Sequence, residues 1–323
     1  MDIKTIITKK RDKKELTEDE IKLFVSKYQK GEISEAQAGS LLSYIYKEGM
    51  TENEIIALAI AMADSGEKIN LKNLEKSVID KHSTGGVGDK VTLILLPVIA
   101  ALGIPIAKIS RRGMGITAGT IDKLESIPGY NTEISIEKFE ENMKEYGIGI
   151  LNQSMNLNPV ESKIYQLRNE IACTDCIPII AASLISIKLA TGSQNIVFEI
   201  TYGNGTYIKT KEQAKKLAKI LKSVGKKLNK GVMCVITNMD EPLGYSIGHN
   251  LEMIEAINAL KGTIPFDLGD VVITIGSVML ALANNNKNFK ENEQMIKEVL
   301  RTGKAYEKFI QMIACQRWKY KLY

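Results

Sequence analysis

The sequence predicts an α/β protein that combines a small all-α domain with a larger mixed α/β domain built on a central sheet. Helix start signals crowd the first part of the chain, up to about residue 65. Between residues 77 and 127, a strand, a glycine-rich loop and a helix follow one another twice. Helical periodicity returns near residues 150–190, and two further predicted strands come after it.

The N-terminal helices begin at residue pairs that satisfy free backbone donors. Apolar side chains then recur at the spacing of one helical face, and Gly49 is placed to end the second helix. The pairs have the capping-box spacing: Thr17 with Glu20, Ser34 with Gln37, and Thr51 with Glu54.

The rest of the chain alternates between strands and helices. In order, we predict a strand at 77–80, a loop at 81–90, a helix at 91–102, a strand at 104–109, a loop at 110–120 and a helix at 121–127. Helices at 163–168 and 179–190 come next, followed by strands at 196–200 and 231–237. Helices dominate from residue 251 onward.

Composition excludes several classes of protein. Of 323 residues, 25% are charged and 44% hydrophobic, which is typical of a soluble globular chain and excludes disorder, collagen and a coiled-coil rod. The N-terminus lacks the apolar core of a signal peptide, and no uninterrupted apolar run reaches the roughly 18–20 residues of a membrane span. A net charge of +5 with 6% aromatic residues does not indicate nucleic-acid binding. We expect a cytoplasmic protein with no membrane or nucleic-acid partner.

Two glycine-rich loops are the sharpest feature: KHSTGGVGDK at 81–90 and SRRGMGITAGT at 110–120. Glycine lets backbone N–H groups approach an anion, and a loop ahead of a helix presents the positive end of the helix dipole. Adjacent strand ends bring such loops together, so the residues predict a phosphate or phosphorylated-sugar site. The alternative, that the glycines only form turns, stays open. The groups able to bind phosphate are Lys81, Ser83, Thr92, Ser110 and Thr120.

These loops carry a family resemblance. KHSTGGVGD, with the stretch S-x-R-G-x-G-x-T-x-G-T-x-D-K-L-E-S-I-P-G that begins at Ser110, closely resembles the thymidine and pyrimidine-nucleoside phosphorylases. The resemblance continues through Tyr165-x-x-Arg168, Ile177-Pro178-Ile179, Ser183 and Glu241-Pro242-Leu243-Gly244.

The resemblance implies a fold and a reaction. Members of this family pair an α domain with an α/β domain, with the active site in the cleft between them, and form homodimers. They cleave pyrimidine nucleosides with inorganic phosphate to the free base and a pentose 1-phosphate. Here it implies an α domain of residues 1–68 and 160–192, through which the homodimer forms, and an α/β domain of residues 69–159 and 193–323.

The resemblance also implies site residues. His82 lies beside the base and the glycosidic bond, as the candidate to donate a proton or hydrogen bond to the departing pyrimidine. No organic cofactor is implied, and inorganic phosphate is the co-substrate. The implied phosphate cradle is Lys81, Ser83, Thr92, Lys108, Ile109, Ser110 and Thr120. The other catalytic or substrate-binding positions are Tyr165, Arg168, Ser183 and Ile187. A potassium site of some members corresponds to Gly88, Lys90, Leu243, Ser246 and Glu255.

Four positions depart from the family pattern. Ile187 stands where the family usually has a lysine that contacts the pyrimidine, and Lys188 is rotated by about 100° from it on a helix. Ile116 replaces a frequent histidine and makes that wall of the base pocket more apolar, and Arg111 replaces a glycine beside the phosphate. Lys90 lies in the potassium-site loop: it is harmless there if it contributes only its carbonyl, whereas its ammonium would displace the ion.

The leading hypothesis is an enzyme of nucleoside salvage that acts on uridine, thymidine or deoxyuridine. Two alternatives stay open: an inactive or decayed relative, favoured by Ile187, and an anthranilate-type phosphoribosyltransferase, which has a related fold. Family members are longer, and the resemblance fails at about Cys315, before the basic tail QRWKYKLY. We expect a frameshift or truncation there, with the C-terminal part of the family's α/β domain missing.

Overall fold

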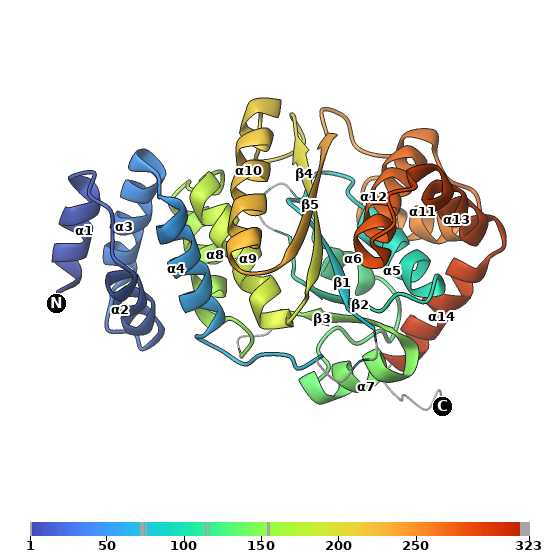
Figure 1. Cartoon of the computed structure of the whole chain (residues 1–323), viewed down its shortest axis with the longest axis horizontal. Coiled ribbons are helices and arrows are strands. Elements are labelled where there is room, and N and C mark those ends of the chain that lie inside the picture. Colours follow the sequence, from blue (N-terminus) through green and yellow to red (C-terminus); the bar gives the residue numbers. More distant parts are fainter. Residues whose placement is uncertain are drawn as a thin grey trace. The chain divides into compact units, whose positions relative to one another are not determined.

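The order of helices and strands follows the predicted alternation. The computed structural model describes residues 2–71, 74, 76–113, 115, 117–153 and 156–316, and Figure 1 traces its elements along the chain. They form two compact units: unit 1 from residues within 1–69, 153–192 and 215–229, and unit 2 from residues within 70–152, 193–214 and 230–323. Compared with the predicted domain boundaries, the helical unit also includes the stretch that begins at Gln153 and residues 215–229.

Unit 1 is helical, and its N-terminal helices begin as predicted. The three capping boxes are confirmed, with Thr17, Ser34 and Thr51 as N-caps, and Gly49 ends its helix with a φ of 78°. The helices are α1 (Ile3–Arg11), α2 (Glu18–Gln29), α3 (Glu35–Glu48), α4 (Glu52–Ala63), α8 (Pro159–Glu170), α9 (Ile177–Thr191) and most of α10 (Lys211–Lys227).

Polar contacts join α10 to α4 within unit 1, to which residues 215–229 belong. Ser223 Oγ donates to Glu52 Oε2 at 2.8 Å, and Lys227 Nζ lies 3.0 Å from the same oxygen. The amphipathic pattern of α10 shows that one of its faces is buried, but a pattern within one helix does not identify the partner of that face.

Unit 2 contains a parallel sheet whose strand order reverses. The order is β3-β2-β1-β4-β5, so the chain builds outward from β1 on one side and then on the other. In such sheets, ligands bind beyond the carboxyl ends of the strands that flank the reversal, which here are β1 and β4. The strands are β1 (Ile79–Ser83), β2 (Ile106–Ser110), β3 (Ile148–Asn152), β4 (Asn195–Tyr202) and β5 (Gly231–Asn238).

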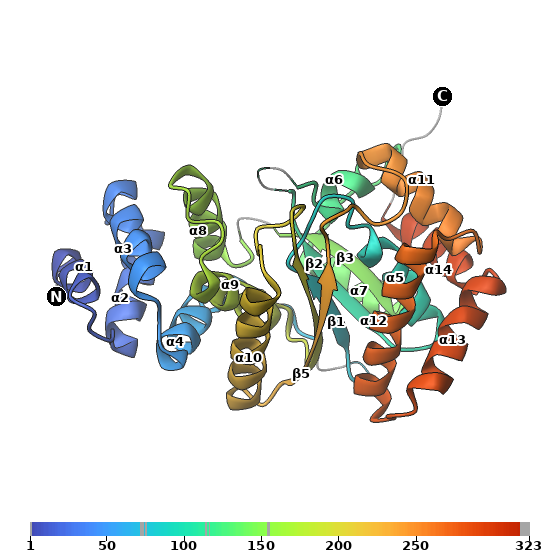
Figure 2. The ribbon, with the colours of Figure 1, turned by 90° about the horizontal axis from the view of Figure 1, so that it is seen from above.

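Helices cover this sheet and enclose the core of unit 2. α5 packs on β1, β2 and β3, while α12 packs on β4 and β5. Figure 2 shows α5 and α12 beside the sheet, with α13 and α14 beyond them. The helices of this unit are α5 (Val91–Ala101), α6 (Thr120–Leu124), α7 (Ile136–Tyr146), α11 (His249–Leu260), α12 (Phe266–Asn284), α13 (Phe289–Arg301) and α14 (Lys304–Cys315).

Among the described residues, α12 alone is long and apolar enough to cross a membrane, judged by length and composition. Half of its apolar window is buried inside the protein, and Asp267 and Asp270 interrupt the apolar run near its start. Leu268, Val272 and Ile275 lie in the core of unit 2. These contacts are those of a core helix.

Four parts of the chain differ from the sequence prediction, two of which are helices that were not predicted, α1 and α7. Residues 81–83, predicted as loop, continue β1 and pair with Val197, Phe198 and Glu199 of β4. A polar run continues a buried strand only when another element supplies partners, and a single sequence does not reveal those partners. β3 was not predicted, because its apolar run is short and interrupted by Gly149.

Candidate active site

The predicted phosphate residues lie on neighbouring strands of unit 2. β1 ends at Ser83 and β2 at Ser110, and Ile79 pairs with Ile106, so both strand ends lie at the same level of the sheet. Thr92 is in the first turn of α5, which follows the first glycine-rich loop, and Thr120 begins α6, which follows the second. The fold thus places both predicted loops at the carboxyl edge of the sheet, next to the strand reversal.

A buried ion pair lies at this edge. The Lys81 side chain is 1% exposed, forms an ion pair with Glu199 of β4, and donates to Thr92 Oγ1 at 3.1 Å. Thr237 of β5 donates to the other oxygen of Glu199 at 3.3 Å. Lys81 is therefore held by polar partners from β4 and α5, and Thr237 of β5 supports its partner Glu199, in a water-poor environment.

The charges of this cluster shift one another's pKa. Burial lowers the pKa of Lys81, but the carboxylates of Glu199 and Asp89 outweigh it and hold the pKa above its usual value. Burial raises the pKa of Asp89, yet the ammonium groups of Lys81 and Lys123 bring it below its usual value. Burial raises the pKa of Glu199, and the charge of Lys81 does not fully compensate for it. Lys81 is thus kept charged beside two carboxylates that compete for it.

Lys108 contacts His82 and favours one tautomer of its ring. Its Nζ donates to the carbonyl of Lys81 at 2.8 Å and lies 3.4 Å from His82 Nδ1. An ammonium group has donors only, so Nδ1 is the acceptor in this contact. A neutral His82 then carries its proton on Nε2, and the ring presents an N–H donor on that side. This is the form needed to donate a hydrogen bond to a departing base.

The second glycine-rich loop is closed by Asp122. Its Oδ2 accepts from the backbone N–H of Gly113 at 2.7 Å and of Gly119 at 2.8 Å. Position 113 requires glycine, because the backbone of Thr117 lies so close that a Cβ at residue 113 would overlap its carbonyl oxygen. Arg111 is partly buried in this loop, and Ile116 lies outside the described residues.

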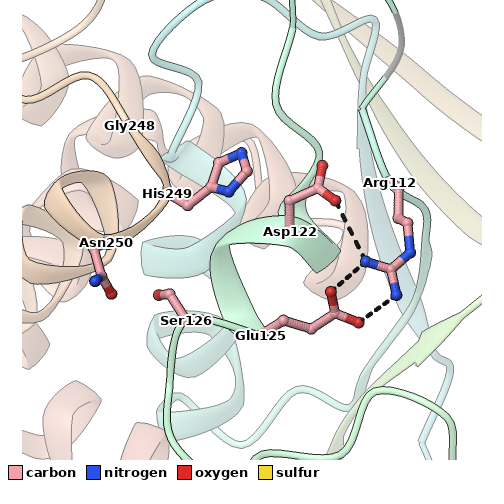
Figure 3. A pocket seen from close by; sticks show the side chains of 7 residues that line it. All are labelled: Arg112, Asp122, Glu125, Ser126, Gly248, His249 and Asn250. Carbon is pink, nitrogen blue, oxygen red and sulfur yellow. Dashed lines mark hydrogen bonds and ion pairs between the residues drawn. The ribbon is translucent and has the colours of Figure 1, made fainter.

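Beside this loop, unit 2 has an open cavity of about 680 Å³. Figure 3 shows Arg112 turned toward Asp122 and Glu125, with His249 and Asn250 of α11 on the opposite wall. Arg112 Nη2 donates to Glu125 Oε1 at 2.8 Å, and Nη1 also contacts this carboxylate. None of the predicted catalytic or phosphate residues lines the cavity. The ion pairs of Arg112 with Asp122 and Glu125 connect the second glycine-rich loop to α6 and the residue that ends it.

The five residues of the implied potassium site do come together, but around an ammonium group. Lys90 Nζ donates to the carbonyls of Leu243 at 2.6 Å and Ser246 at 2.8 Å, and to Glu255 Oε2 at 2.6 Å. Gly88 adopts a φ of +82°, and a Cβ there would be 2.9 Å from Pro242 Cβ, so the loop contacts the segment that carries Leu243. Among the described residues, no group of three His, Cys, Asp or Glu side chains could hold a metal ion.

Unit 1 gathers the residues implied for the pyrimidine. Ser183 of α9 is buried and donates to Glu161 Oε1 of α8, while Glu161 Oε2 accepts from Gln153 Nε2 at 2.6 Å. Arg168 of α8 is also buried; its Nε donates to the carbonyl of Cys173 at 3.2 Å and its Nη2 to that of Thr174. The guanidinium therefore holds the turn between α8 and α9.

The other predicted residues of unit 1 lie on these two helices. Tyr165 is half-buried on α8, one turn from Arg168. Ile187 and Lys188 are both buried on α9. An apolar side chain thus stands at the position where the resemblance implies a charged one.

Sequence reasoning missed two carboxylates that contact predicted site residues. Glu199 contacts Lys81, and Glu161 accepts from Ser183. Glu199 had a detectable signal, since it stands inside the apolar strand sequence NIVFEITY. A charged residue in such a strand needs a buried partner. Glu161 had no such signal, because α8 is polar on average and a glutamate does not stand out in its sequence.

The chain is similar to known proteins over most of its length. Residues 75–306 match the family described as "Glycosyl transferase family, a/b domain", and residues 4–66 match "Glycosyl transferase family, helical bundle domain". The chain is 44% identical to the pyrimidine-nucleoside phosphorylase of Staphylococcus haemolyticus and 43% identical to that of Bacillus subtilis. Each match spans 304 residues, 94% of this chain and 70% of the relative.

A solved structure shares the fold. The anthranilate phosphoribosyltransferase of Thermus thermophilus superposes with a TM-score of 0.76 over 98% of this chain and 99% of its own, at 20% identity. That likeness concerns the fold alone, whereas the two family matches and the 43–44% identity concern the sequence as well. The chain therefore belongs to the pyrimidine-nucleoside phosphorylase family of glycosyl transferases.

Proposed function

We propose that the protein catalyses the phosphorolysis of pyrimidine nucleosides such as uridine, thymidine and deoxyuridine, in nucleoside salvage. The observation that carries the proposal is the buried cationic edge of unit 2, where Lys81 and Lys108 lie among the hydroxyls that follow β1 and β2. The relatives at 43–44% identity, named pyrimidine-nucleoside phosphorylases, support this reaction.

Inorganic phosphate is the co-substrate in this reaction. On binding, the phosphate loses its hydration shell. It is then bound by the ammonium of Lys81, by the backbone beside Ile109, and by the hydroxyls of Ser83, Thr92, Ser110 and Thr120. Lys108 acts at the base of this cradle, where it already bonds to the carbonyl of Lys81. Fixing the dianion in this way removes most of the entropic cost of bringing nucleophile and sugar together.

The chemical step transfers the pentosyl group. A phosphate oxygen forms a bond to C1′ of the sugar while the bond from C1′ to the base nitrogen breaks, and the electron pair leaves with the base. His82, held with its proton on Nε2 by Lys108, donates to the base as negative charge develops on it. The products are the free pyrimidine and the pentose 1-phosphate.

The polar residues of unit 1 bind the pyrimidine. Ser183 supplies a hydroxyl, Arg168 holds the adjoining turn and acts on the ring edge, and Tyr165 lies on the same helix. Ile187 makes an apolar contact where relatives of the resembled family usually place a lysine. We further propose a homodimer formed through the helices of unit 1, which follows from the resemblance, and a cytoplasmic location, which follows from the composition and the N-terminal sequence.

The deciding experiment measures release of uracil or thymine from each nucleoside, with and without inorganic phosphate. We expect release that depends on phosphate, with pentose 1-phosphate formed in equal amount. A protein that releases no base under any of these conditions is an inactive relative, and the proposal fails. A protein that reacts only with phosphoribosyl pyrophosphate and an aromatic amine is a phosphoribosyltransferase, which would also overturn it.

A further inference from the structure

The ammonium group of Lys90 connects the first glycine-rich loop to the segment of residues 243–255. The Lys90 side chain has no solvent exposure, and its ammonium lies 2.6–2.8 Å from three oxygen atoms. An ammonium group has three N–H donors. Each donor therefore has one acceptor: the carbonyls of Leu243 and Ser246 and the carboxylate of Glu255.

The acceptors form a rigid cage. Glu255, on α11, also accepts from the backbone N–H of Tyr245 at 2.9 Å and of Ser246 at 3.2 Å. One carboxylate thus fixes the turn whose carbonyls point at Lys90 Nζ. The net charge of ammonium and carboxylate is zero. A buried pair is stable only in this balanced state, because either charge alone would be left uncompensated in a low-dielectric surrounding.

A potassium ion does not fit this cage. It would have to share three oxygen atoms with an ammonium group that already bonds to all of them, and it would bring a second positive charge to hydrogen-bond distance. Like charges at that distance repel strongly where water is excluded. The residues that the resemblance assigned to potassium therefore hold a tethered cation instead.

We propose that Lys90 is a built-in replacement for a monovalent cation, so that this protein is independent of potassium. Lys90 directly precedes α5, whose Thr92 accepts from Lys81, and follows Asp89, which accepts from the Val91 N–H at 3.2 Å. Its anchoring to the 243–255 segment thereby positions the cradle. Lys90 is a positioning residue; its effect on phosphate binding rests on the proposed function, while its effect on stability does not.

The test compares wild type with Lys90→Ala in potassium chloride and in tetramethylammonium chloride at equal ionic strength. Wild type should show the same melting temperature and the same KM for phosphate in both salts. Lys90→Ala leaves Glu255 and two carbonyls without a cation. In tetramethylammonium its melting temperature should fall by about 5–10 °C, and its KM should rise about tenfold or more. Potassium or ammonium ions should restore most of both losses.

Two control variants separate cation replacement from general damage. Lys123→Ala removes another buried ammonium, which lies 2.6 Å from Glu252 and contacts the carbonyl of Asp89, but it leaves only one carbonyl beside the carboxylate. We expect no potassium-specific recovery there. Lys90→Met fills the same volume without charge and should not be rescued either.

Three results would overturn the proposal: a wild-type melting temperature that rises with potassium, a Lys90→Ala protein as stable as wild type in tetramethylammonium, or equal rescue of Lys123→Ala. The melting temperature needs no catalysis. An inactive wild type would therefore refute the proposed function and leave this inference to be decided by the thermal data.

Discussion

The polar clusters of the two units are held in different ways. In unit 2, charge faces charge: Lys81 lies against Glu199, and the charge of Asp89 also acts on it. In unit 1, the Arg168 guanidinium bonds to two backbone carbonyls, and the Ser183 hydroxyl donates to Glu161. The unit 2 cluster is thus held mainly by attraction between opposite charges. The unit 1 cluster is held by hydrogen bonds with defined donors and acceptors.

This difference matches the ligand proposed for each cluster. A phosphate dianion is recognised by concentrated positive charge, and in unit 2 it must displace internal carboxylates from Lys81. A pyrimidine ring is neutral and flat, so a site for it depends on donor and acceptor placement more than on charge. The apolar Ile187 is compatible with this view, because a neutral ring does not need a charged contact at that position.

The largest effect is expected for Lys81→Met, which removes the central charge of the unit 2 cluster. Without the ammonium, Glu199 loses its buried counter-charge, and Asp89 keeps only the charge of Lys123. We expect kcat/KM to fall about a thousandfold, mainly through phosphate, since charge stabilisation in a water-poor site is among the largest catalytic contributions. Steady-state kinetics with varied phosphate measures the loss.

The double variant Lys81→Met with Glu199→Gln controls for misfolding. Neutralising both partners should recover most of the thermal stability without recovering the activity, because the buried carboxylate is gone but the phosphate ligand is still missing. A Lys81→Met protein that keeps wild-type phosphate kinetics would show that the cluster of unit 2 does not bind phosphate.

A second prediction concerns the turn that Arg168 holds in unit 1. Burial raises the pKa of the Cys176 thiol from 9.0 to about 11, and the nearby guanidinium of Arg168 does not reverse this. The unfolded chain then releases the proton at lower pH than the folded one. The stability that this thiol contributes is complete below pH 9.0 and is lost as the pH rises to about 11.

Urea unfolding of wild type and Cys176→Ala across this pH range isolates the effect. The wild-type free energy of unfolding should decline more than that of the variant, by up to about 3 kcal/mol from a two-unit shift. Parallel pH curves for the two proteins would mean that the thiol is not buried, and that charge rather than burial governs this turn.

The smallest expected effect belongs to Glu161→Gln. Glu161 accepts the Ser183 hydroxyl, which leaves Ser183 to meet a ligand as an acceptor, suited to the N3–H of uracil or thymine. A glutamine can reverse this bond, so we expect kcat/KM for uridine to fall about tenfold. The preference for uridine over cytidine should fall with it.

Glu170→Gln, at an exposed position on the same helix, is the matched control and should change neither value. If Glu161→Gln and Glu170→Gln behave alike, hydrogen-bond direction does not select the base, and the contrast between the two clusters loses its functional meaning.

Much of this architecture could be predicted from local sequence. Capping pairs such as Thr17 with Glu20 act over one helical turn, and the strand, loop and helix order around 81–120 is equally local. Phosphate candidates such as Lys81 came from the chemistry of the glycine-rich loops, whereas the roles of Arg168 and Lys90 came from the resemblance.

The local sequence did not predict which residues pair with Lys81 and Lys90. Lys81 meets Glu199, and Lys90 meets Glu255, far along the chain. Such pairs depend on strand order and on where α11 packs, and neither is encoded in a local pattern. Whether Lys90 used its carbonyl or its ammonium could be decided only once the oxygens around it were placed.

The strand order also has a consequence for biosynthesis. β1 is completed early, but the neighbour that covers its second edge is β4, whose Ile196 pairs with Asp80 after the chain has returned to unit 1 to form α8 and α9. While the ribosome makes that intervening segment, β1 keeps an open edge and Lys81 has no Glu199. The central strand of the finished sheet is thus an edge strand of the nascent one until β4 is made.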